Sequence, residues 1–254
     1  VHTLVEAKKL AFVEREELAG DPAHVRAPLE LLLGDDHGRE LAAQIDPERA
    51  ALRPGRPSRA GDTTYFAVVD GWGNAVSAIQ SIANPFGCCA LDPRTGILLN
   101  SRMVWFHTDT DHPNVVAPRK HVRNTINPPL AIADGQVRSV FGTPGGAAQV
   151  EVTLQMLPSV VDFGLDPQQA LEAPRWTHFQ PGTGSYYPHV DPELLVLESR
   201  FSAETIAELR RRGHAVSVVD PLEGGCAGSM IVRDESGLLL AGADPRRDGW
   251  ALAF

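Results

Sequence analysis

The strongest constraint on this chain is an abrupt change of character at Thr63. Residues 47–62, PERAALRPGRPSRAGD, carry proline, glycine and arginine with no periodic apolar face, a composition typical of an exposed linker. Residues 65–69 directly after them form an apolar run of strand length. An exposed linker is therefore expected to end, and a rigid strand to begin, at the peptide bond between Asp62 and Thr63.

A hairpin is predicted immediately after this change. Residues 70–74, DGWGN, have the composition of a tight turn, and residues 75–82 form a second apolar run. Further strands are expected over 96–106, 136–142, 215–220, 229–234 and 237–244. Helices are expected over 2–19, in one or two short pieces within 28–46, over 143–157, from 166 and over 203–212.

Local signals support several of these helices. The first is expected to bury an apolar face made of Leu4, Val5, Ala7, Leu10, Ala11 and Val13. Asp166 is a candidate N-cap followed by Pro167 in the first helical position, and Ser202 is a candidate N-cap of the last helix. Helices and strands in this order fit a layered α/β or α+β domain, and no internal repeat is visible.

Composition excludes several classes of function. The net charge of -9 argues against a nucleic-acid surface, and no uninterrupted apolar run is long enough to span a membrane. Cys88, Cys89 and Cys226 make no disulfide framework, and no cysteine–histidine spacing resembles a zinc site. The first residues lack the pattern of a signal peptide. The compartment stays undetermined.

Thr63 could act as a nucleophile if the bond after Asp62 is cut. The freed α-amine, with a reference pKa of roughly 7.7–8.0, could then serve as a base for the hydroxyl of the same residue. Threonine is also common at the start of a strand. The residues taken alone favour that structural interpretation.

The segment GTPGGAA, residues 142–148, follows a predicted strand and opens a predicted helix. Backbone N–H groups of Gly145 and Gly146 could there hold negative charge that develops on a substrate oxygen. A simple strand-to-helix turn explains the same glycines. The segment lacks the ending of a phosphate-binding loop.

Residues 107–112, HTDTDH, offer another possible site. His107, Asp109, Asp111 and His112 could bind a cation, but nothing in their spacing fixes them as ligands, so a solvated loop is the preferred interpretation. No metal site and no Gly-x-Ser-x-Gly nucleophile elbow is expected. The remaining histidines that could matter, His178, His189 and His214, are scattered and receive no role.

These segments occur in an order that resembles the sequences of the gamma-glutamyltransferases, a family of N-terminal-nucleophile hydrolases. The resemblance runs almost from end to end. It is carried by EAKKLAFVEREELAGDP, DTTYFAVVDGWGNAVSAIQSIANPFG, GILLNSRM, GTPGG, FGLDPQQALEAPRWTH and GADPRRDG, in family order. The resemblance implies an α+β fold, namely a four-layer αββα sandwich. It also implies that the chain is autocatalytically cleaved before Thr63. Residues 1–62 would then be the tail of a large subunit with its linker, and 63–254 the small catalytic subunit.

The resemblance also implies roles for individual residues. Thr63 matches the nucleophile, and Ser81 matches a family threonine whose hydroxyl assists it. Gly145 and Gly146 match the glycines of the oxyanion hole. No cofactor is implied, and the expected partners are a small-molecule substrate and the rest of the large subunit.

The positions that match the family's substrate-binding residues differ from the family pattern. Ala83, Arg102 and Trp105 replace the groups that hold a glutamyl ammonium, although the neighbouring Asn84 could substitute. Asn124 and Thr125 match a serine pair that binds the α-carboxylate, and both can still donate hydrogen bonds. The carboxylate site is thus expected to survive without the ammonium site.

This difference predicts a changed substrate preference. Leaving an ammonium unpaired beside Arg102 is costly, so acyl groups without it, such as glutaryl, are expected to be favoured. That preference resembles the cephalosporin-acylase-like branch of the family, and the short segment between Met103 and Asn124 predicts an open pocket. A catalytically inactive relative that serves as a binding or assembly protein is the alternative.

Overall fold

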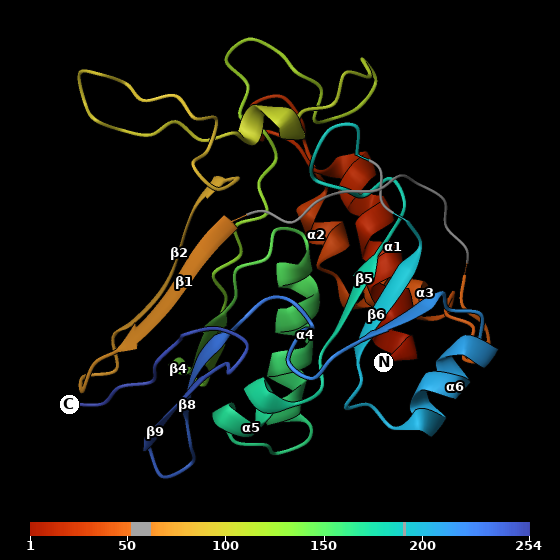
Figure 1. The fold of residues 1–254 in the computed structure, drawn as a ribbon, viewed down its shortest axis with the longest axis vertical. Coiled ribbons are helices and arrows are strands. Elements are labelled where there is room, and N and C mark those ends of the chain that lie inside the picture. Colours follow the sequence, from red (N-terminus) through yellow and green to blue (C-terminus); the bar gives the residue numbers. More distant parts are fainter. Residues whose placement is uncertain (52–61, 190–191) are drawn as a thin grey trace.

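The computed structural model describes residues 1–51, 62–189 and 192–254 (Figure 1). Most of the predicted linker therefore lies outside the described residues. The helices are α1 (His2–Leu18), α2 (Leu29–Leu32), α3 (Asp35–Ala42), α4 (Ala148–Val161), α5 (Pro167–Glu172) and α6 (Ala203–Arg211), with a 3-10 turn, η1 (Arg102–Trp105). The strands are β1 (Asp62–Val69), β2 (Ala75–Ala83), β3 (Leu130–Ala133), β4 (Gln136–Gly142), β5 (Trp176–Phe179), β6 (Leu194–Glu198), β7 (Val216–Val219), β8 (Ser229–Arg233) and β9 (Leu239–Ala243).

These strands form three sheets. Strands β1 and β2 make an antiparallel ribbon, and β3, β4, β8 and β9 make an antiparallel four-stranded sheet in that order. In the third sheet, β5 pairs antiparallel and β7 parallel with the central strand β6. The predicted hairpin is therefore confirmed, and so are the strands predicted around β4, β7, β8 and β9.

The ribbon, the four-stranded sheet and two helices lie in successive layers (Figure 1). The ribbon approaches β4 closely because Gly142 has no side chain: a Cβ there would lie 2.4 Å from the ring of Tyr65. Helices α4 and α5 lie against the same sheet, and the Gln168 side-chain amide bonds both backbone groups of Ala243 on β9. This mixed layering agrees with the predicted α+β class.

Two apolar clusters hold the layers together. One joins α1 to the third sheet and to α6, through Val5, Trp176, Leu195, Leu197 and Leu209. The other joins the four-stranded sheet to α4 and α5, through Phe141, Val152, Met156, Leu171 and Met230. Since α1 supplies the first cluster, residues before Thr63 share a core with residues after it.

Helix α1 buries only part of the predicted face: Val5 and Leu10 are buried as predicted. Ala11 is exposed, and Leu4, Ala7 and Val13 are only partly buried. The buried residues are His2, Val5, Glu6, Lys8, Lys9, Leu10 and Phe12. The prediction failed because it assumed that charged side chains face water, whereas Lys8 and Lys9 find acidic partners inside the protein.

The strand predicted over 96–106 is wrong. Apart from one isolated bridge between Leu91 and Leu98, this segment is bound to the end of β2 and then turns into η1. Ser101 donates its backbone N–H to the Ile82 carbonyl, and its hydroxyl oxygen accepts the N–H of Asn84. Side-chain bonds of this kind compete with sheet pairing, which apolar composition alone does not reveal.

Other local predictions fared better, with some omissions. Asp166 caps α5 in a full capping box with Pro167 at the first position, and the Ser202 side chain caps α6. Helix α5 is much shorter than α4, and β3, β5 and β6 were not predicted. Among the described residues, no helix combines the length and apolar character needed to cross a membrane.

Candidate active site

Thr63 lies where the pairing of β1 with β2 is irregular. Asp62 pairs with Ala83 and Thr64 with Gln80, so the register shifts at the residue between them. Such bulges turn a side chain out of the regular alternation of a strand. The Thr63 hydroxyl donates a hydrogen bond to Ser81 Oγ at 3.1 Å, and the same oxygen accepts the N–H of Ala83 at 3.1 Å. The sequence pair Thr63 and Ser81 is thus in direct contact.

The glycine segment forms the connection from β4 to α4. Gly145 and Gly146 have φ values of 134° and 58°, and their carbonyls accept the first backbone bonds of the helix. A Cβ at Gly145 would lie 2.1 Å from Cys226 Sγ, so only glycine fits there. The first N–H groups of a helix have no intrahelical partner, which makes this connection suited to an anion.

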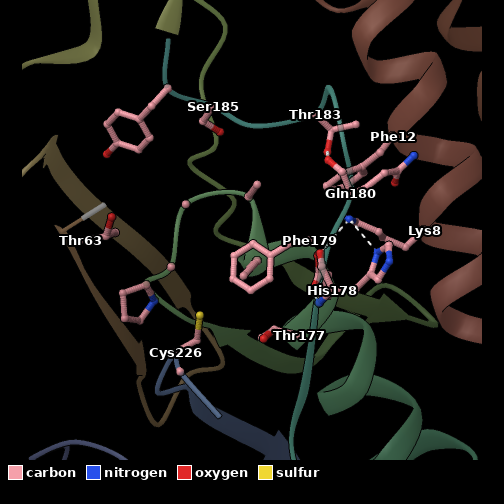
Figure 2. A pocket seen from close by; sticks show the side chains of 18 of the residues that line it. Lys8, Phe12, Thr63, Thr177, His178, Phe179, Gln180, Thr183, Ser185 and Cys226 are labelled. Atoms are coloured by element: carbon pink, nitrogen blue, oxygen red, sulfur yellow. Dashed lines mark hydrogen bonds and ion pairs between the residues drawn. The ribbon is translucent and has the colours of Figure 1, made fainter. Parts of the chain in front are cut away.

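Thr63 and both glycines line one cavity of about 210 Å³ (Figure 2). The end of the cavity away from Thr63 is lined by Phe12, Lys8 and His178, and in this view Phe179 lies between them and Thr63. These residues come from α1 and β5, so the cavity joins segments that are far apart in the sequence. The remaining lining residues are Pro144, Ala147, Ala148, Glu151, Thr177, Gln180, Thr183, Ser185, Tyr186, Gly225, Cys226 and Arg247.

A buried ion pair occupies the α1 side of this cavity. Lys8 Nζ lies 3.3 Å from Glu151 Oε1, 2.9 Å from the His178 carbonyl oxygen and 3.3 Å from His178 Nδ1. The other oxygen of Glu151 accepts the backbone N–H of His178 at 2.6 Å, and His178 Nε2 lies 3.1 Å from Glu193 Oε1. Lys8, Glu151 and His178, here called the inner cluster, therefore bind mainly one another.

Burial governs protonation around the cavity. It lowers the pKa of His178 to about 4, although Glu193 opposes the shift, so the ring is neutral near pH 7. Burial also raises the pKa of Glu151, an effect that Lys8 opposes. The thiol of Cys226 has its pKa raised by burial to about 12 and is therefore not a nucleophile at neutral pH.

The residues predicted to bind substrate lie outside the lining of this cavity. Arg102 and Trp105 are one contact away: Arg102 Nη2 lies 3.5 Å from the Ser81 carbonyl oxygen, and its guanidinium lies 4.3 Å from the Trp105 ring centre. Trp105 in turn packs edge-on against Tyr186, which does line the cavity. These two residues therefore support the wall beside Ser81.

The other three predicted residues, Asn84, Asn124 and Thr125, also lie outside the cavity lining. Asn84 is bonded through its backbone to Ser101, next to the end of β2. Asn124 is exposed, and its side-chain oxygen accepts the N–H of Ile126. Thr125 beside it is half-buried. A role in substrate binding stays a prediction for all three.

The histidines of residues 107–112 lie in a different environment from the solvated loop predicted. Asp109 and Asp111 are exposed, but the rings of His107 and His112 stack at 3.4 Å, and both Nε2 atoms lie within 3.7 Å of Glu16 Oε2. Ring planes 6° apart direct their lone pairs side by side rather than at one ion. Arg123 also holds that Glu16 oxygen at 2.7 Å, so the geometry does not favour a metal.

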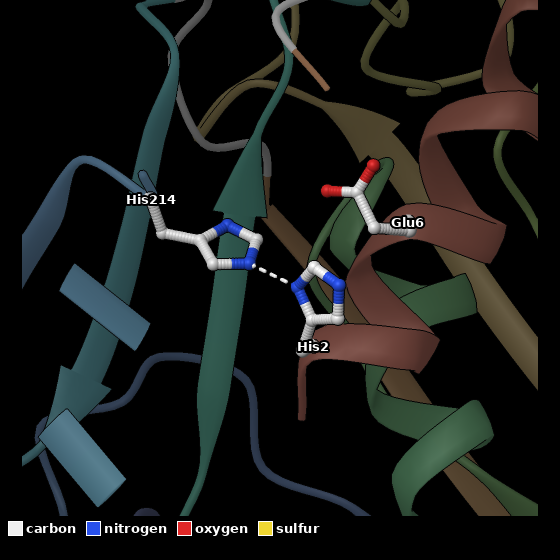
Figure 3. Close-up of side chains that lie close together, drawn as sticks. All are labelled: His2, Glu6 and His214. Atoms are coloured by element: carbon white, nitrogen blue, oxygen red, sulfur yellow. Dashed lines mark hydrogen bonds between the residues drawn. The ribbon is translucent and has the colours of Figure 1, made fainter. Parts of the chain in front are cut away.

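A second group of possible ligands, His2, Glu6 and His214, is fully buried (Figure 3). His2 Nδ1 and His214 Nε2 are 2.7 Å apart, which is a hydrogen-bond distance. Two nitrogens on one tetrahedral zinc would stay about 3.3 Å apart. Glu6 is held by Lys9 and by the N–H of Ala51. This group therefore joins α1 to the segment before β7 without a metal.

Sequence reasoning missed several residues of the cavity, chiefly Lys8, Glu151, His178, Cys226 and Arg247. The one available signal was the pair Lys8 and Lys9 directly before the apolar run of residues 10–13. His178 was left without a role because the strand that carries it was not predicted.

A threonine hydroxyl at the start of a strand, bonded to a serine and sharing a cavity with a glycine loop, is the arrangement expected of an N-terminal-nucleophile hydrolase. The chain belongs to the gamma-glutamyltranspeptidase family, whose sequence profile matches residues 1–254. The resemblance found in the sequence is thereby confirmed.

Named relatives agree with this assignment. The chain is 39% identical over 256 residues to the glutathione hydrolase-like YwrD proenzyme of Bacillus subtilis, covering 100% of this chain and 47% of the relative. The crystal structure of cephalosporin acylase from Bacillus halodurans matches with a TM-score of 0.85 and 34% identity, over 100% of this chain and 44% of that one. The chain thus spans about half the length of such relatives.

A third match covers a different share of the chain. The gamma-glutamyltranspeptidase from Pseudomonas nitroreducens complexed with L-DON matches with a TM-score of 0.62 and 25% identity. The match takes in 75% of this chain but 99% of that one. Together with the acylase structure, it confirms the predicted N-terminal-nucleophile hydrolase fold and the similarity to the acylase-like branch.

Proposed function

We propose that the protein containing this chain hydrolyses or transfers acyl groups from γ-glutamyl or related glutaryl-type amides, with Thr63 as its nucleophile. The observation that carries the proposal is that Thr63, hydrogen-bonded to Ser81, lines one cavity together with the glycine loop. Nucleophile, assisting hydroxyl and a place for the oxyanion then lie within one small volume.

Processing is the first step of the proposed mechanism. The Thr63 hydroxyl attacks the carbonyl carbon of Asp62, the peptide becomes an ester, and water releases Thr63 with a free α-amine. Ser81 Oγ accepts the hydrogen of the Thr63 hydroxyl and so orients its oxygen. The register shift between Asp62 and Thr64 supports this step, because it exposes the bond outside regular strand pairing.

Turnover repeats the same chemistry on a substrate. The α-amine of Thr63 takes the proton of the hydroxyl, whose oxygen attacks the substrate carbonyl and forms a threonyl ester. The N–H groups at Gly145 and Gly146 stabilise the oxyanion. The α-amine returns the proton to the leaving amine, and water or a second amine then accepts the acyl group.

The proposed division of the chain is 1–62 as the tail of a large subunit and 63–254 as the small subunit. Its support is the transpeptidase chain of Pseudomonas nitroreducens, almost all of which matches about three quarters of this chain. Helix α1 is buried against β5 and β6, so the tail stays bound after cleavage. The rest of the large subunit is the expected partner.

The preference for glutaryl over γ-glutamyl groups rests on Arg102. Its guanidinium is buried against the Ser81 carbonyl, where a substrate ammonium placed near Ser81 would meet a second cation. Trp105 packs on that guanidinium and offers no carboxylate in its place. Relative rates on glutaryl- and γ-glutamyl-4-nitroanilide test this preference directly, and a strong preference for the γ-glutamyl compound would contradict it.

N-terminal sequencing of the purified full-length protein tests the function itself. A new terminus at Thr63 and amidase activity are expected, and Thr63→Ala should abolish both. Thr64→Ala is the matched control, because Thr64 is adjacent but exposed. A chain that stays uncleaved and inactive while still binding glutaryl compounds would overturn the proposal in favour of a non-catalytic binding protein.

A further inference from the structure

The charged side chains that line the cavity differ in whether they have a partner of opposite charge. At the inner cluster, Lys8 and Glu151 neutralise each other, and the low pKa of His178 keeps that ring uncharged near pH 7. Cys226 is neutral as well. Within the described part of the chain, Arg247 is the one charged residue of the cavity lining whose side chain has no hydrogen bond or ion pair. The cavity therefore carries a net positive charge in a protein whose total charge is negative.

The two neighbouring arginines of the segment DPRRD differ sharply. Arg246 is bound to both Glu198 and Asp244 and donates to the carbonyl oxygens of Leu171 and Ala173. Arg247 is fixed through its backbone N–H, which bonds the Asp244 carbonyl, while its side chain is exposed. Arg246 thus fixes the turn, and the fixed turn places Arg247 at the cavity.

Of the charged residues that line the cavity, Arg247 is exposed, whereas Lys8 and Glu151 are buried. Arg247 lines the cavity together with Gly225 and Cys226, and Cys226 is the residue that touches the glycine loop at Gly145. Phe12 and the inner cluster, by contrast, are buried. The acyl part of a substrate stays at Thr63 as the ester, whereas the amine part leaves toward solvent, where Arg247 is exposed.

We propose that Arg247 binds a carboxylate on the amine part of the amide substrate and so selects anionic leaving groups. This inference rests on the proposed function of the site. A guanidinium can bond a carboxylate through two parallel N–H groups, which gives it direction as well as charge. The positive N-terminal end of α4 beside the glycine loop adds to the attraction.

The test compares two chromogenic amides that differ in one carboxylate, the 4-nitroanilide and the 3-carboxy-4-nitroanilide, each with glutaryl and γ-glutamyl acyl groups. The full-length wild type should prefer the carboxylated amide. In Arg247→Gln, the ratio of kcat/KM for the carboxylated amide to kcat/KM for the neutral amide should fall by about tenfold. Arg247→Lys should retain part of the preference, and added salt should weaken the preference both in the wild type and in Arg247→Lys.

Arg94→Gln is the matched control, because Arg94 is also exposed but lies outside the cavity lining. It should leave the ratio of the two rates unchanged. Equal ratios in active wild type and active Arg247→Gln would overturn the inference while the proposed function stands. Failure of the wild type to hydrolyse any of the amides would overturn the proposed function, and this inference with it.

Discussion

The two ends of the cavity differ in how completely their polar groups are paired. At the inner cluster, Lys8 Nζ has three acceptors within 3.3 Å, and both oxygens of Glu151 are engaged. Around Thr63, the polar groups are a hydroxyl, the N–H groups of a glycine loop and the unpaired side chain of Arg247. Groups satisfied by the protein stabilise it, whereas groups with remaining capacity can bind a substrate. Buried charged residues therefore do not by themselves identify the catalytic end of the cavity.

The largest expected effect separates activity from stability at the Thr63 end. Thr63→Ala should lower kcat by up to about a millionfold, the size measured when the nucleophile of a serine protease is removed. The melting temperature should change little, because the half-buried side chain loses only a small apolar group and a hydroxyl. Rate assays and calorimetry on one preparation check both statements. A large fall in melting temperature would contradict the view that Thr63 serves activity and not stability.

The opposite pattern is expected at the inner cluster. Lys8→Met leaves Glu151 buried without its cation, which should destabilise the protein by about 3–5 kcal/mol. Chemical denaturation of the processed protein measures this free energy of unfolding.

Combining Lys8→Met with Glu151→Met provides the control. Removing both charges should recover part of the lost stability, because no unpaired charge is left. If the double variant is no more stable than the sum of the single effects predicts, the ion pair is not what holds this end together.

A smaller effect is expected within the glycine loop. Gly145→Ala brings a Cβ to 2.1 Å from Cys226 Sγ at a φ that alanine does not adopt, so the loop must move. Activity should fall by up to about a hundredfold, the lower end of the cost of removing one oxyanion donor. Gly146→Ala, with no atom within 4 Å of its Cβ, should cost only about 1 kcal/mol of stability. Equal losses of activity in both variants would contradict the steric argument.

The smallest effect concerns pH. Burial lowers the pKa of His178 to about 4 and those of His107 and His214 to about 3, each from 6.5. Unfolding then takes up protons below pH 6.5, so stability should fall as the pH drops from about 7 toward 4. Between pH 7 and 6 the loss should be less than about 1 kcal/mol per histidine.

The carboxylate of Glu16 affects stability at a lower pH than the histidines do. Burial would raise its pKa, but His112, Arg15 and Arg123 lower it to about 2, so its contribution is lost only as the pH falls from about 4.5 to 2. The fall in stability between pH 7 and 5 therefore belongs to the histidines, and the raised pKa of Glu151 opposes it. His178→Gln should flatten this fall in thermal denaturation across that range, and an unchanged slope would contradict the assignment.

Much of the local structure could be predicted because it depends on neighbouring residues. The capping box at Asp166, the N-cap at Ser202 and the hairpin turn at 70–74 are short-range hydrogen-bond patterns. The strand predicted over 96–106 failed because Ser101 bonds the end of β2. That contact depends on where the chain returns in space, and no local pattern contains it.

The sequence by itself determined the change of character at Thr63, the glycine loop after β4 and, through the order of its motifs, the family. Only the tertiary structure decided that Thr63 and Ser81 touch, that α1 and β5 complete the cavity, and that the side chain of Arg246 is buried while Arg247 is exposed. The physical reason is distance along the chain. Periodicity and caps act within a few residues, whereas charge compensation and burial depend on segments that meet only in the folded protein.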